Sequence, residues 1–291
     1  MSFRFNFSCN DDHKIERNTN LIETNTKKVQ WLESEEITVD TQIEQLDSMV
    51  QHAKMFICGD NIEIGHVVAN EAVANIISED GVQNGTELAE SNHSDLITGK
   101  YEGGLKIWEG TTDLIEYLIE SVNKNQWKEA NVLDLGCGAG ILGIYSLLNG
   151  AYTTFQDYNK EVIKYVTIPN VLLNLEDDSE MCITRCKFYC GDWSSFNKKL
   201  DNSKPYDIIL TSETIYNEEN YDKLIEIFLQ RLSKNGSAYV AAKTCYFGVG
   251  GGTRQFEKRI EKCGSLKSEV CWKSTGGIQR EILKITHTSQ Q

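Results

Sequence analysis

Residues 131–150 constrain the fold of this chain more than any other stretch. A short apolar run at 132–135 predicts a buried strand, and the glycines that follow it predict a tight loop. Apolar residues then recur at helical spacing over 139–149, and Gly150 is placed to end that helix. A strand, a glycine loop and a helix in this order form the first unit of a nucleotide-binding α/β sheet, because glycines let the backbone approach a ligand and a helix N-terminus offers free N–H groups.

The glycine loop is compatible with two kinds of cofactor. Gly138, Gly140 and Gly143 satisfy G-x-G-x-x-G, the dinucleotide fingerprint, which favours an NAD enzyme. Asp134, however, ends the strand two residues before Gly136 and gives Asp-x-Gly-x-Gly-x-Gly, which resembles the first motif of S-adenosylmethionine (SAM) methyltransferases. A carboxylate in that position can attract the cationic amino acid end of SAM. A glycine-rich turn that binds no ligand is a third interpretation. Of the three, we favour a SAM site.

Charge narrows the class of protein. The 291 residues carry a net charge of −14, and residues 1–100 hold 18 Asp and Glu against 7 Lys and Arg, whereas 101–291 hold 25 against 22. Such an acidic chain attracts a nucleic-acid backbone poorly, so we expect a basic protein as partner and no direct nucleic-acid binding. We find neither a long apolar run nor a leader, and we expect no membrane span.

The nine cysteines are scattered without paired spacing, which predicts free thiols in a reducing compartment. Cys182, Cys186 and Cys190 form C-x3-C-x3-C. Steps of four residues in a strand simply repeat one face, so we predict no metal site there.

The chain divides in two near residue 95. Residues 1–95 lack sustained hydrophobic periodicity and are predicted to be an acidic, largely disordered extension with one transient helix near 67–77. At its start, Phe3, Phe5 and Phe7 alternate with polar residues, which indicates either a strand that docks on a sheet edge or a stray apolar cluster. Residues 96–291 are predicted to be the catalytic domain, and we expect a monomer.

Predicted strands alternate with predicted helices from residue 96 onward. The strands are expected at 132–135, 152–156, 185–190, 206–211 and 237–242, followed by an antiparallel hairpin at 266–271 and 278–286. This order predicts an α/β fold with a seven-stranded, doubly wound Rossmann-like sheet and a C-terminal hairpin.

Polar residues follow the central strands, at the edge of such a sheet where ligands bind. Asp157 follows the second strand and is expected to hold both ribose hydroxyls of SAM. Asp192 and Trp193 follow the third, where they offer an acceptor for the adenine amino group and a ring that covers the base. Ser212 and Glu213 follow the fourth strand, over the reacting centre. Each residue alone is a weak signal, but the series favours a SAM site.

Two further segments are candidates for the site. Trp108 and Glu109 precede the first strand, where they can fold over the methionine part of SAM, and an aromatic face attracts a sulfonium. A core tryptophan that anchors the linker is an equally good interpretation of Trp108. The glycine-rich loop 247–252 either admits a substrate segment or is an ordinary surface turn.

The motifs of this chain closely resemble those of the eukaryotic histidine protein methyltransferases. The resemblance covers roughly 95–286 and the opening Ser-Phe-Arg-Phe-Asn-Phe, and its segments are 102–111, 132–140, 155–159, 191–193, 210–216 and 246–252. It implies a seven-β-strand SAM-dependent enzyme, cytoplasmic and nuclear, that methylates one histidine of a large-subunit ribosomal protein near the peptidyl-transferase centre. It also implies further cofactor contacts by Ile107, Gly110, Thr111, Gln156, Tyr158, Asn159 and Gly191.

The resemblance leaves two acceptors to compare, because Glu213-x-x-Tyr216 is also similar to the Asp-x-x-Tyr of related lysine-directed enzymes. We expect histidine, with Glu213 accepting the imidazole N–H and Tyr216 as a pocket wall or second donor. All five histidines lie outside 96–286, so no core histidine can act as a base. Imidazole, with a reference pKa of about 6.5, hardly needs one, whereas lysine, at about 10.4, must first lose a proton. A lysine methyltransferase, an NAD-dependent oxidoreductase and a non-catalytic binding module are the alternatives.

Overall fold

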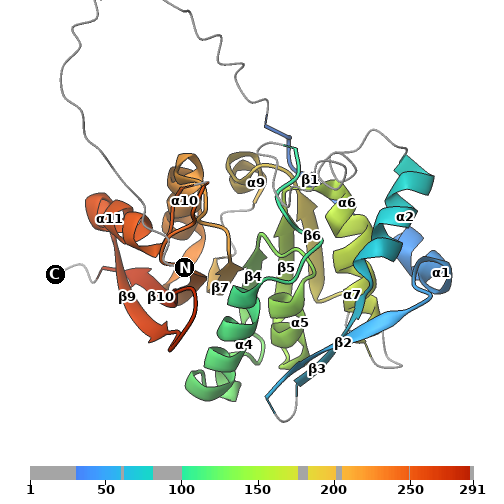
Figure 1. Ribbon diagram of the computed structural model, residues 1–291, viewed down its shortest axis with the longest axis horizontal. Coiled ribbons are helices and arrows are strands. Elements are labelled where there is room, and N and C mark those ends of the chain that lie inside the picture. The colour runs from blue at the N-terminus through green and yellow to red at the C-terminus, as the bar shows by residue number, and fades with distance from the viewer. Residues whose placement is uncertain are drawn as a thin grey trace, which may run out of the picture. The chain divides into compact units, whose positions relative to one another are not determined.

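The computed structural model describes residues 31–59, 62–80, 100–175, 183–200, 205–248 and 250–288. The centre of this part is an eight-stranded sheet in the order β1-β6-β5-β4-β7-β8-β10-β9 (Figure 1). Its strands are β1 (Glu35–Glu36), β4 (Asn131–Leu135), β5 (Tyr152–Asp157), β6 (Cys186–Cys190), β7 (Tyr206–Ser212), β8 (Leu232–Lys243), β9 (Leu266–Lys273) and β10 (Arg280–His287). The five from β6 to β8 in this order run parallel, and β1 and β10 pair antiparallel with their neighbours.

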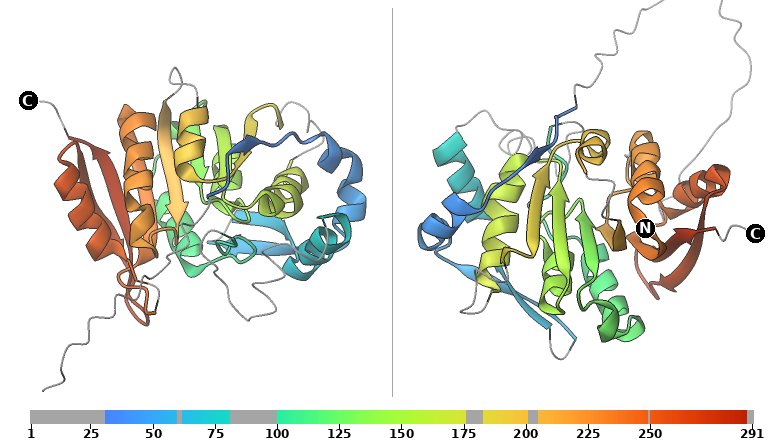
Figure 2. Two further views of the ribbon diagram at one scale, coloured as in Figure 1. Left: turned by 90° about the horizontal axis from the view of Figure 1, so that it is seen from above. Right: turned by 180° about the vertical axis from the view of Figure 1, so that it is seen from behind.

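Helices cover both faces of the sheet (Figure 2). The apolar strands explain this arrangement: in β4, Val132 belongs to one buried cluster and Leu133 to a second one, because successive side chains point to opposite faces. One cluster includes residues of α4 (Glu109–Ser121), α5 (Ile141–Leu148), α6 (Lys160–Val162), a π-helical turn (Ile163–Thr167) and α7 (Ile168–Leu173). The other includes residues of α9 (Trp193–Lys199), α10 (Tyr221–Arg231) and α11 (Thr253–Cys263), and short 3-10 turns lie at Lys124–Gln126 and Glu218–Asn220.

The predicted doubly wound sheet and its C-terminal hairpin are confirmed. β10 lies between β8 and β9 and pairs antiparallel with both. The sheet has one more strand than predicted, because β1 pairs with the outer edge of β6 through Glu35↔Cys190 and Glu36↔Tyr189. This strand belongs to the region that was expected to be disordered.

The prediction of a largely disordered extension over 1–95 is wrong for residues 31–59 and 62–80. These residues form β1, α1 (Asp40–Met49), β2 (Ala53–Cys58), β3 (Ile62–Val67) and α2 (Ala69–Asp80). The helix expected near 67–77 is therefore α2, and it is packed, since Ala72 and Ile76 are each 1% exposed. The described residues on both sides of the predicted boundary at 95 belong to one contact unit. Residues 1–30, including Phe3, Phe5 and Phe7, and residues 81–99 lie outside the described ranges.

Long-range contacts hold this N-terminal part against the sheet domain. Ile64 of β3 is fully buried in the same cluster as Leu114 of α4 and Ile144 of α5. The outer edge of β3 is satisfied by side chains from α7 and its C-cap: the Val67 N–H donates to Asn170 Oδ1 at 2.7 Å, and the Gly65 N–H donates to Asn174 Oδ1 at 2.8 Å. The elements are short and depend on partners that lie far away in sequence, which is why local periodicity did not show them.

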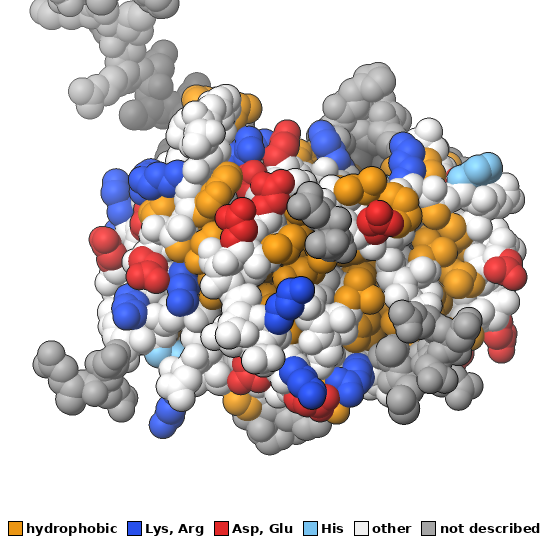
Figure 3. Space-filling model, turned by 90° about the horizontal axis from the view of Figure 1, so that it is seen from below, with side chains coloured by type: hydrophobic (Ala, Val, Ile, Leu, Met, Phe, Trp, Pro, Cys, Tyr) orange, Lys and Arg blue, Asp and Glu red, His pale blue; other side chains and the backbone are white. Residues whose placement is uncertain are grey.

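The lower face of the molecule carries mixed side chains (Figure 3). Hydrophobic groups spread across the middle of this face, and acidic and basic groups alternate around them, so its described part presents no continuous basic surface. Within the described ranges, no helix combines the length and apolar character that crossing a membrane would require.

Two substitutions in the β2–β3 hairpin test whether it belongs to the folded core. Ile64→Ala should lower the free energy of unfolding by about 2–5 kcal/mol, because it opens a cavity in a fully buried site. Ile57→Ala, on the paired strand but 66% exposed, should change it by less than about 0.5 kcal/mol. Urea unfolding followed by circular dichroism compares the two variants. Small and equal effects would show that the hairpin lies outside the cooperative unit.

Candidate active site

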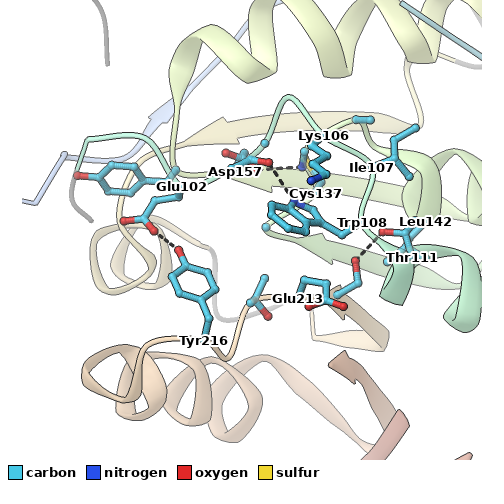
Figure 4. A pocket seen from close by; sticks show the side chains of 18 of the residues that line it. Glu102, Lys106, Ile107, Trp108, Thr111, Cys137, Leu142, Asp157, Glu213 and Tyr216 are labelled. Carbon is cyan, nitrogen blue, oxygen red and sulfur yellow. Dashed lines mark hydrogen bonds between the residues drawn. The ribbon is translucent and has the colours of Figure 1, made fainter. Parts of the chain in front are cut away.

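A deep pocket lies at the carboxyl ends of β4, β5, β6 and β7, where the strand order reverses beside β4 (Figure 4). It encloses about 860 Å³ of empty space, part of which is open to solvent. Most of the predicted site residues line it: Ile107, Trp108, Thr111, Gly136, Gly138, Asp157, Tyr158, Gly191, Asp192, Trp193, Ser212, Glu213 and Tyr216.

The glycine loop after β4 forms a close-packed cradle on one side of the pocket. Gly136 and Gly138 have φ values of +68° and +49°, in the left-handed region that favours glycine. A Cβ on Gly136 would lie 2.6 Å from Thr214 Cγ2, and one on Gly138 would lie 3.0 Å from the Gly104 carbonyl oxygen. Side chains at these two positions would therefore collide with the opposite wall.

Asp157 joins this loop to the end of β5. Its side chain is buried, and Oδ2 accepts the Gly138 N–H at 2.9 Å while Oδ1 accepts the Asn159 N–H at 3.2 Å. Burial raises the pKa of Asp157 to about 6. A carboxylate has about four acceptor positions, so both oxygens retain capacity for the two adjacent hydroxyls of a ribose.

Aromatic and polar groups after β5 and β6 form the opposite end of the pocket. The Trp193 Nε1–H donates to Gln156 Oε1 at 2.9 Å, and Gln156 Nε2–H donates to the Gly191 carbonyl at 2.8 Å. Asp192 is more engaged than predicted: Oδ2 accepts the Ser194 N–H at the start of α9, and Oδ1 pairs with Lys223 Nζ at 2.5 Å.

Five predicted cofactor residues do not line the pocket: Glu109, Gly110, Asp134, Gln156 and Asn159. The expected direct attraction between Asp134 and the cationic end of SAM is wrong. This side chain is 1% exposed and accepts the Gly143 N–H at 2.8 Å, so it does not face the pocket. Burial raises its pKa well above the ordinary value. Asp134 therefore braces the glycine loop from behind.

The other four residues support the wall. Gln156 orients Trp193, as described above. Asn159 donates from Nδ2 to the Lys100 carbonyl at 2.6 Å and accepts the Glu102 N–H at 3.1 Å, which ties segment 100–104 to β5. Glu109 lies near Lys243 Nζ at 3.7 Å, and Gly110 packs directly on Glu213.

Trp108 is half-buried in the pocket wall, which contradicts a role as a core anchor. Its Nε1–H donates to the Gly103 carbonyl at 3.1 Å, and Lys106 Nζ lies 4.5 Å from the ring centroid. A ring in this position presents a π-face to a cationic ligand.

Glu213 has a strained backbone conformation at one end of the pocket. We call this end, beside Glu213 and Tyr216, the acceptor end, because these residues were predicted to face the methyl acceptor. Its φ is +57°, which costs a non-glycine residue about 1–3 kcal/mol and commonly marks a functional site. The Tyr246 hydroxyl donates to Oε2 at 2.5 Å, whereas Oε1 has no hydrogen-bond partner among the described residues. The carboxylate abuts the first turn of α4, since a Cβ on Gly110 would lie 2.8 Å from Oε1.

Burial is the largest influence on the pKa of Glu213 and raises it. The hydrogen bond from Tyr246 and the charge of Lys243 oppose this shift by favouring the carboxylate. The positive end of the α4 dipole acts in the same direction. Glu213 is therefore a buried acceptor whose Oε2 takes the Tyr246 hydrogen bond and whose Oε1 has no hydrogen-bond partner among the described residues.

Tyr216 lies on the far side of the acceptor end. Its hydroxyl donates to Glu102 Oε2, and Figure 4 shows the two side chains pointing toward each other. The Tyr216 and Tyr246 rings meet edge to face at 6.3 Å. The loop that carries Tyr246 is anchored at its end, because the Gly252 N–H donates to the Ile215 carbonyl at 3.0 Å.

Several pocket residues were not predicted: Trp31, Glu102, Gly103, Gly104, Lys106, Cys137, Ala139, Ile141, Leu142, Thr214 and Asn220. Residues 102–104 and 137–139 lie within the quoted motifs, so proximity to those motifs was a usable signal. Trp31 gave none, because it precedes every recognisable element. Among the described residues, no group of three or more His, Cys, Asp or Glu side chains could hold a metal ion, and Cys182 lies outside the described ranges.

The sheet order and the pocket at its switch point define a doubly wound α/β fold with a ligand site at the carboxyl ends of its strands. The chain belongs to the methyltransferase family described as "Lysine methyltransferase", which matches residues 94–260. Membership of this family argues against the NAD-dependent oxidoreductase and makes SAM the cofactor.

Two relatives carry a more specific name. The chain is 45% identical over 196 residues to "Histidine protein methyltransferase 1 homolog" of Dictyostelium discoideum. The alignment covers 67% of this chain and 61% of that protein. It is 44% identical over 221 residues to the homolog of Bos taurus, covering 67% and 58%. The chain thus spans about three fifths of the length of these relatives. Among solved structures, the glycopeptide N-methyltransferase MtfA complexed with SAM aligns with a TM-score of 0.45 at 13% identity, over 62% of this chain and 94% of that one.

The residues present fit SAM. Gly136 and Gly138 let the loop lie close to the opposite wall of the pocket, where any Cβ would collide, Asp157 supplies the acceptors for a ribose, and Trp193 and Tyr158 supply flat surfaces for a base. Trp108 would offer its ring to the sulfonium. When bound, SAM supplies an activated methyl group on sulfur.

The raised pKa of Asp157 predicts a pH dependence of ligand binding. The ribose hydroxyls need the carboxylate form, so below about pH 6 a ligand must displace a proton and affinity should fall by up to tenfold per pH unit. Calorimetry with S-adenosylhomocysteine between pH 5 and 8 measures this. Asp157→Asn should bind more weakly and without this pH dependence, and Asp157→Ala more weakly still. A wild-type affinity that stays constant across this range would remove Asp157 from the ribose site.

Proposed function

We propose that this protein is a SAM-dependent protein-histidine N-methyltransferase that acts on a histidine of a large-subunit ribosomal protein near the peptidyl-transferase centre. Relatives named as histidine protein methyltransferases, 42–45% identical over 67% of this chain, support the reaction. The observation that carries the choice of acceptor is Glu213, a buried carboxylate in the pocket with one unpartnered oxygen.

Glu213 would orient the imidazole. If Oε1 accepts the N–H of the target ring, it fixes one tautomer and turns the lone pair of the other nitrogen toward the methyl group. Tyr246 holds Oε2 and so keeps the carboxylate from rotating. As the methylated ring becomes cationic, the contact becomes charge-assisted, so it stabilises the transition state more than the ground state.

The rest of the acceptor end would position the ring. Tyr216 would form one wall, and its bond to Glu102 fixes the hydroxyl away from the reacting nitrogen. The enzyme needs no base of its own, because a neutral imidazole already carries the attacking lone pair. Alignment of the two reactants is then the main task of the protein.

The net charge of −14 suits a basic ribosomal protein as substrate, since opposite charges raise the encounter rate. A substrate of this kind would place the enzyme in the cytoplasm and the nucleus. A lysine acceptor is the second candidate, because the matching family is described as lysine methyltransferase. A lysine would first have to lose a proton, at a site where the nearest carboxylate is already held by Tyr246.

Amino-acid analysis of a labelled substrate tests the acceptor. The protein is incubated with methyl-labelled SAM and separately with large ribosomal subunits and free large-subunit proteins, and the hydrolysed products are separated. We expect label in methylhistidine from one protein. Label in methyllysine would replace the proposal by its second candidate. Binding of SAM with no transfer to any of these proteins would count against the ribosomal substrate.

Glu213→Gln tests the role of the carboxylate. The variant keeps the size of the side chain and removes its charge, so turnover should fall about ten- to a thousandfold while the affinity for S-adenosylhomocysteine stays the same. Tyr246→Phe is the companion variant: it removes the donor that favours the ionised form, so the acid limb of the pH–rate profile should move to higher pH. Full activity of Glu213→Gln, or loss of cofactor binding, would mean that Glu213 merely caps α4.

A further inference from the structure

A segment from the N-terminal part crosses the end of the pocket that lies after β5 and β6. We call residues 31–37 the N-terminal strap. The Leu32 N–H donates to the Tyr158 hydroxyl at 3.3 Å, and the Leu32 carbonyl accepts the Asp192 N–H at 2.9 Å. The Ser34 N–H donates to Ser195 Oγ at 2.9 Å. The strap is therefore hydrogen-bonded to residues that follow β5 and to residues that follow β6.

The strap is packed too closely to be an incidental contact. Its β1 pairs with β6, and the Ile37 N–H donates to the Phe188 carbonyl at 2.8 Å. Gly191 has a φ of +101°, and a Cβ there would lie 2.6 Å from the Glu33 carbonyl oxygen. Glycine at 191 thus serves the approach of the strap, in addition to its place beside the pocket.

The strap brings the Trp31 ring into the pocket and holds it there. Lys223 Nζ lies 3.4 Å from the ring centroid and 2.5 Å from Asp192 Oδ1, and both of these charged side chains are mostly buried. The Tyr158 ring meets Trp31 edge to face, at 6.0 Å and 89°. Lys223 and Tyr158 therefore hold the indole in place where it lines the pocket.

We propose that Trp31 is a cofactor-binding residue that packs on the adenine base, with Lys223 and Asp192 as positioning residues that hold its ring. Trp31 lines the same pocket as Tyr158, Asp192 and Trp193, which follow β5 and β6, so it lies at the base end and far from Glu213 in the order of strands. A purine has two flat faces, and aromatic side chains bind such faces without needing a particular hydrogen-bond pattern.

The proposal adds a role to the one expected for Asp192. Its carboxylate was predicted to accept the adenine amino group, and it also holds the ammonium that covers Trp31, since one oxygen is bound to Lys223 and the other to the Ser194 N–H. The buried ion pair acts on the base through the Trp31 ring. The inference rests on the proposed function only for the identity of the cofactor, and not for the acceptor.

Calorimetric titration of the full chain with S-adenosylhomocysteine tests the proposal. Trp31→Ala should weaken binding about ten- to a hundredfold, the range for one aromatic ring on a base, and Trp31→Phe should recover most of the affinity. Leu32→Ala is the matched control in the same strap, because its side chain is 44% exposed and its bonds are made by the backbone. It should bind as the wild type does.

A photoaffinity label separates contact from a purely structural role. An 8-azido derivative of S-adenosylhomocysteine carries its reactive group on the base, and after irradiation we expect the label on Trp31. Unchanged affinity in Trp31→Ala would overturn the proposal, as would an equal loss in Trp31→Ala and Trp31→Phe with no label on residue 31. If the wild-type protein did not bind S-adenosylhomocysteine, the cofactor assignment would fall as well; if it did bind, failure of the variants would concern Trp31 alone.

Discussion

The hydrogen bond from the Gly138 N–H to the Asp157 carboxylate joins the ends of two neighbouring strands at the centre of the sheet. It fixes the glycine loop against β5 and keeps a buried charge next to the space that a ligand would fill. This arrangement costs stability. The folded-state pKa of about 6 exceeds the ordinary 3.8, so between these values the folded protein holds a proton that the unfolded chain has released, and the stability due to this group declines as pH rises through this window.

Other buried carboxylates around the pocket have the same character. Burial also raises the pKa of Asp134, just behind the loop, and that of Glu213 at the acceptor end. Neither Asp134 nor Asp157 forms an ion pair with a cationic side chain of the described residues. Burying several acids without cations is unfavourable for folding and typical of functional sites.

The sequence specifies the sheet domain far better than the part that closes it. The strand–loop–helix unit at 131–150 is local, so apolar runs and glycines predict it, and the order of the strands follows. Ile64 and Trp31, by contrast, find their partners many residues away, on α5 and α10. No pattern within 31–80 indicates those partners. The prediction of disorder failed there because it judged the segment by its own composition, while its apolar residues are buried by the rest of the chain.

The same limit explains which site residues were misplaced. Asp157 and Gln156 are neighbours at the end of one strand, but successive side chains point to opposite faces, so only Asp157 lines the pocket. Gln156 acts on the site only indirectly, by accepting the hydrogen bond that orients Trp193. Asp134 turns behind the loop to the Gly143 N–H. Position after a strand identifies the group of residues at the site, whereas the direction of each side chain depends on hydrogen bonds that only the folded chain makes.

The geometry of Glu213 bears on which methyl acceptor suits the site. The strained backbone, Tyr246 and the first turn of α4 all hold one carboxylate in one place. An anion fixed in this way stabilises positive charge that develops on any attacking nitrogen. For imidazole that charge appears only during methyl transfer, so the carboxylate acts on the transition state. A lysine arrives already charged, and the same carboxylate would stabilise its unreactive ammonium form. In its carboxylate form, a Glu213 fixed in this way would favour an acceptor that is neutral before it reacts.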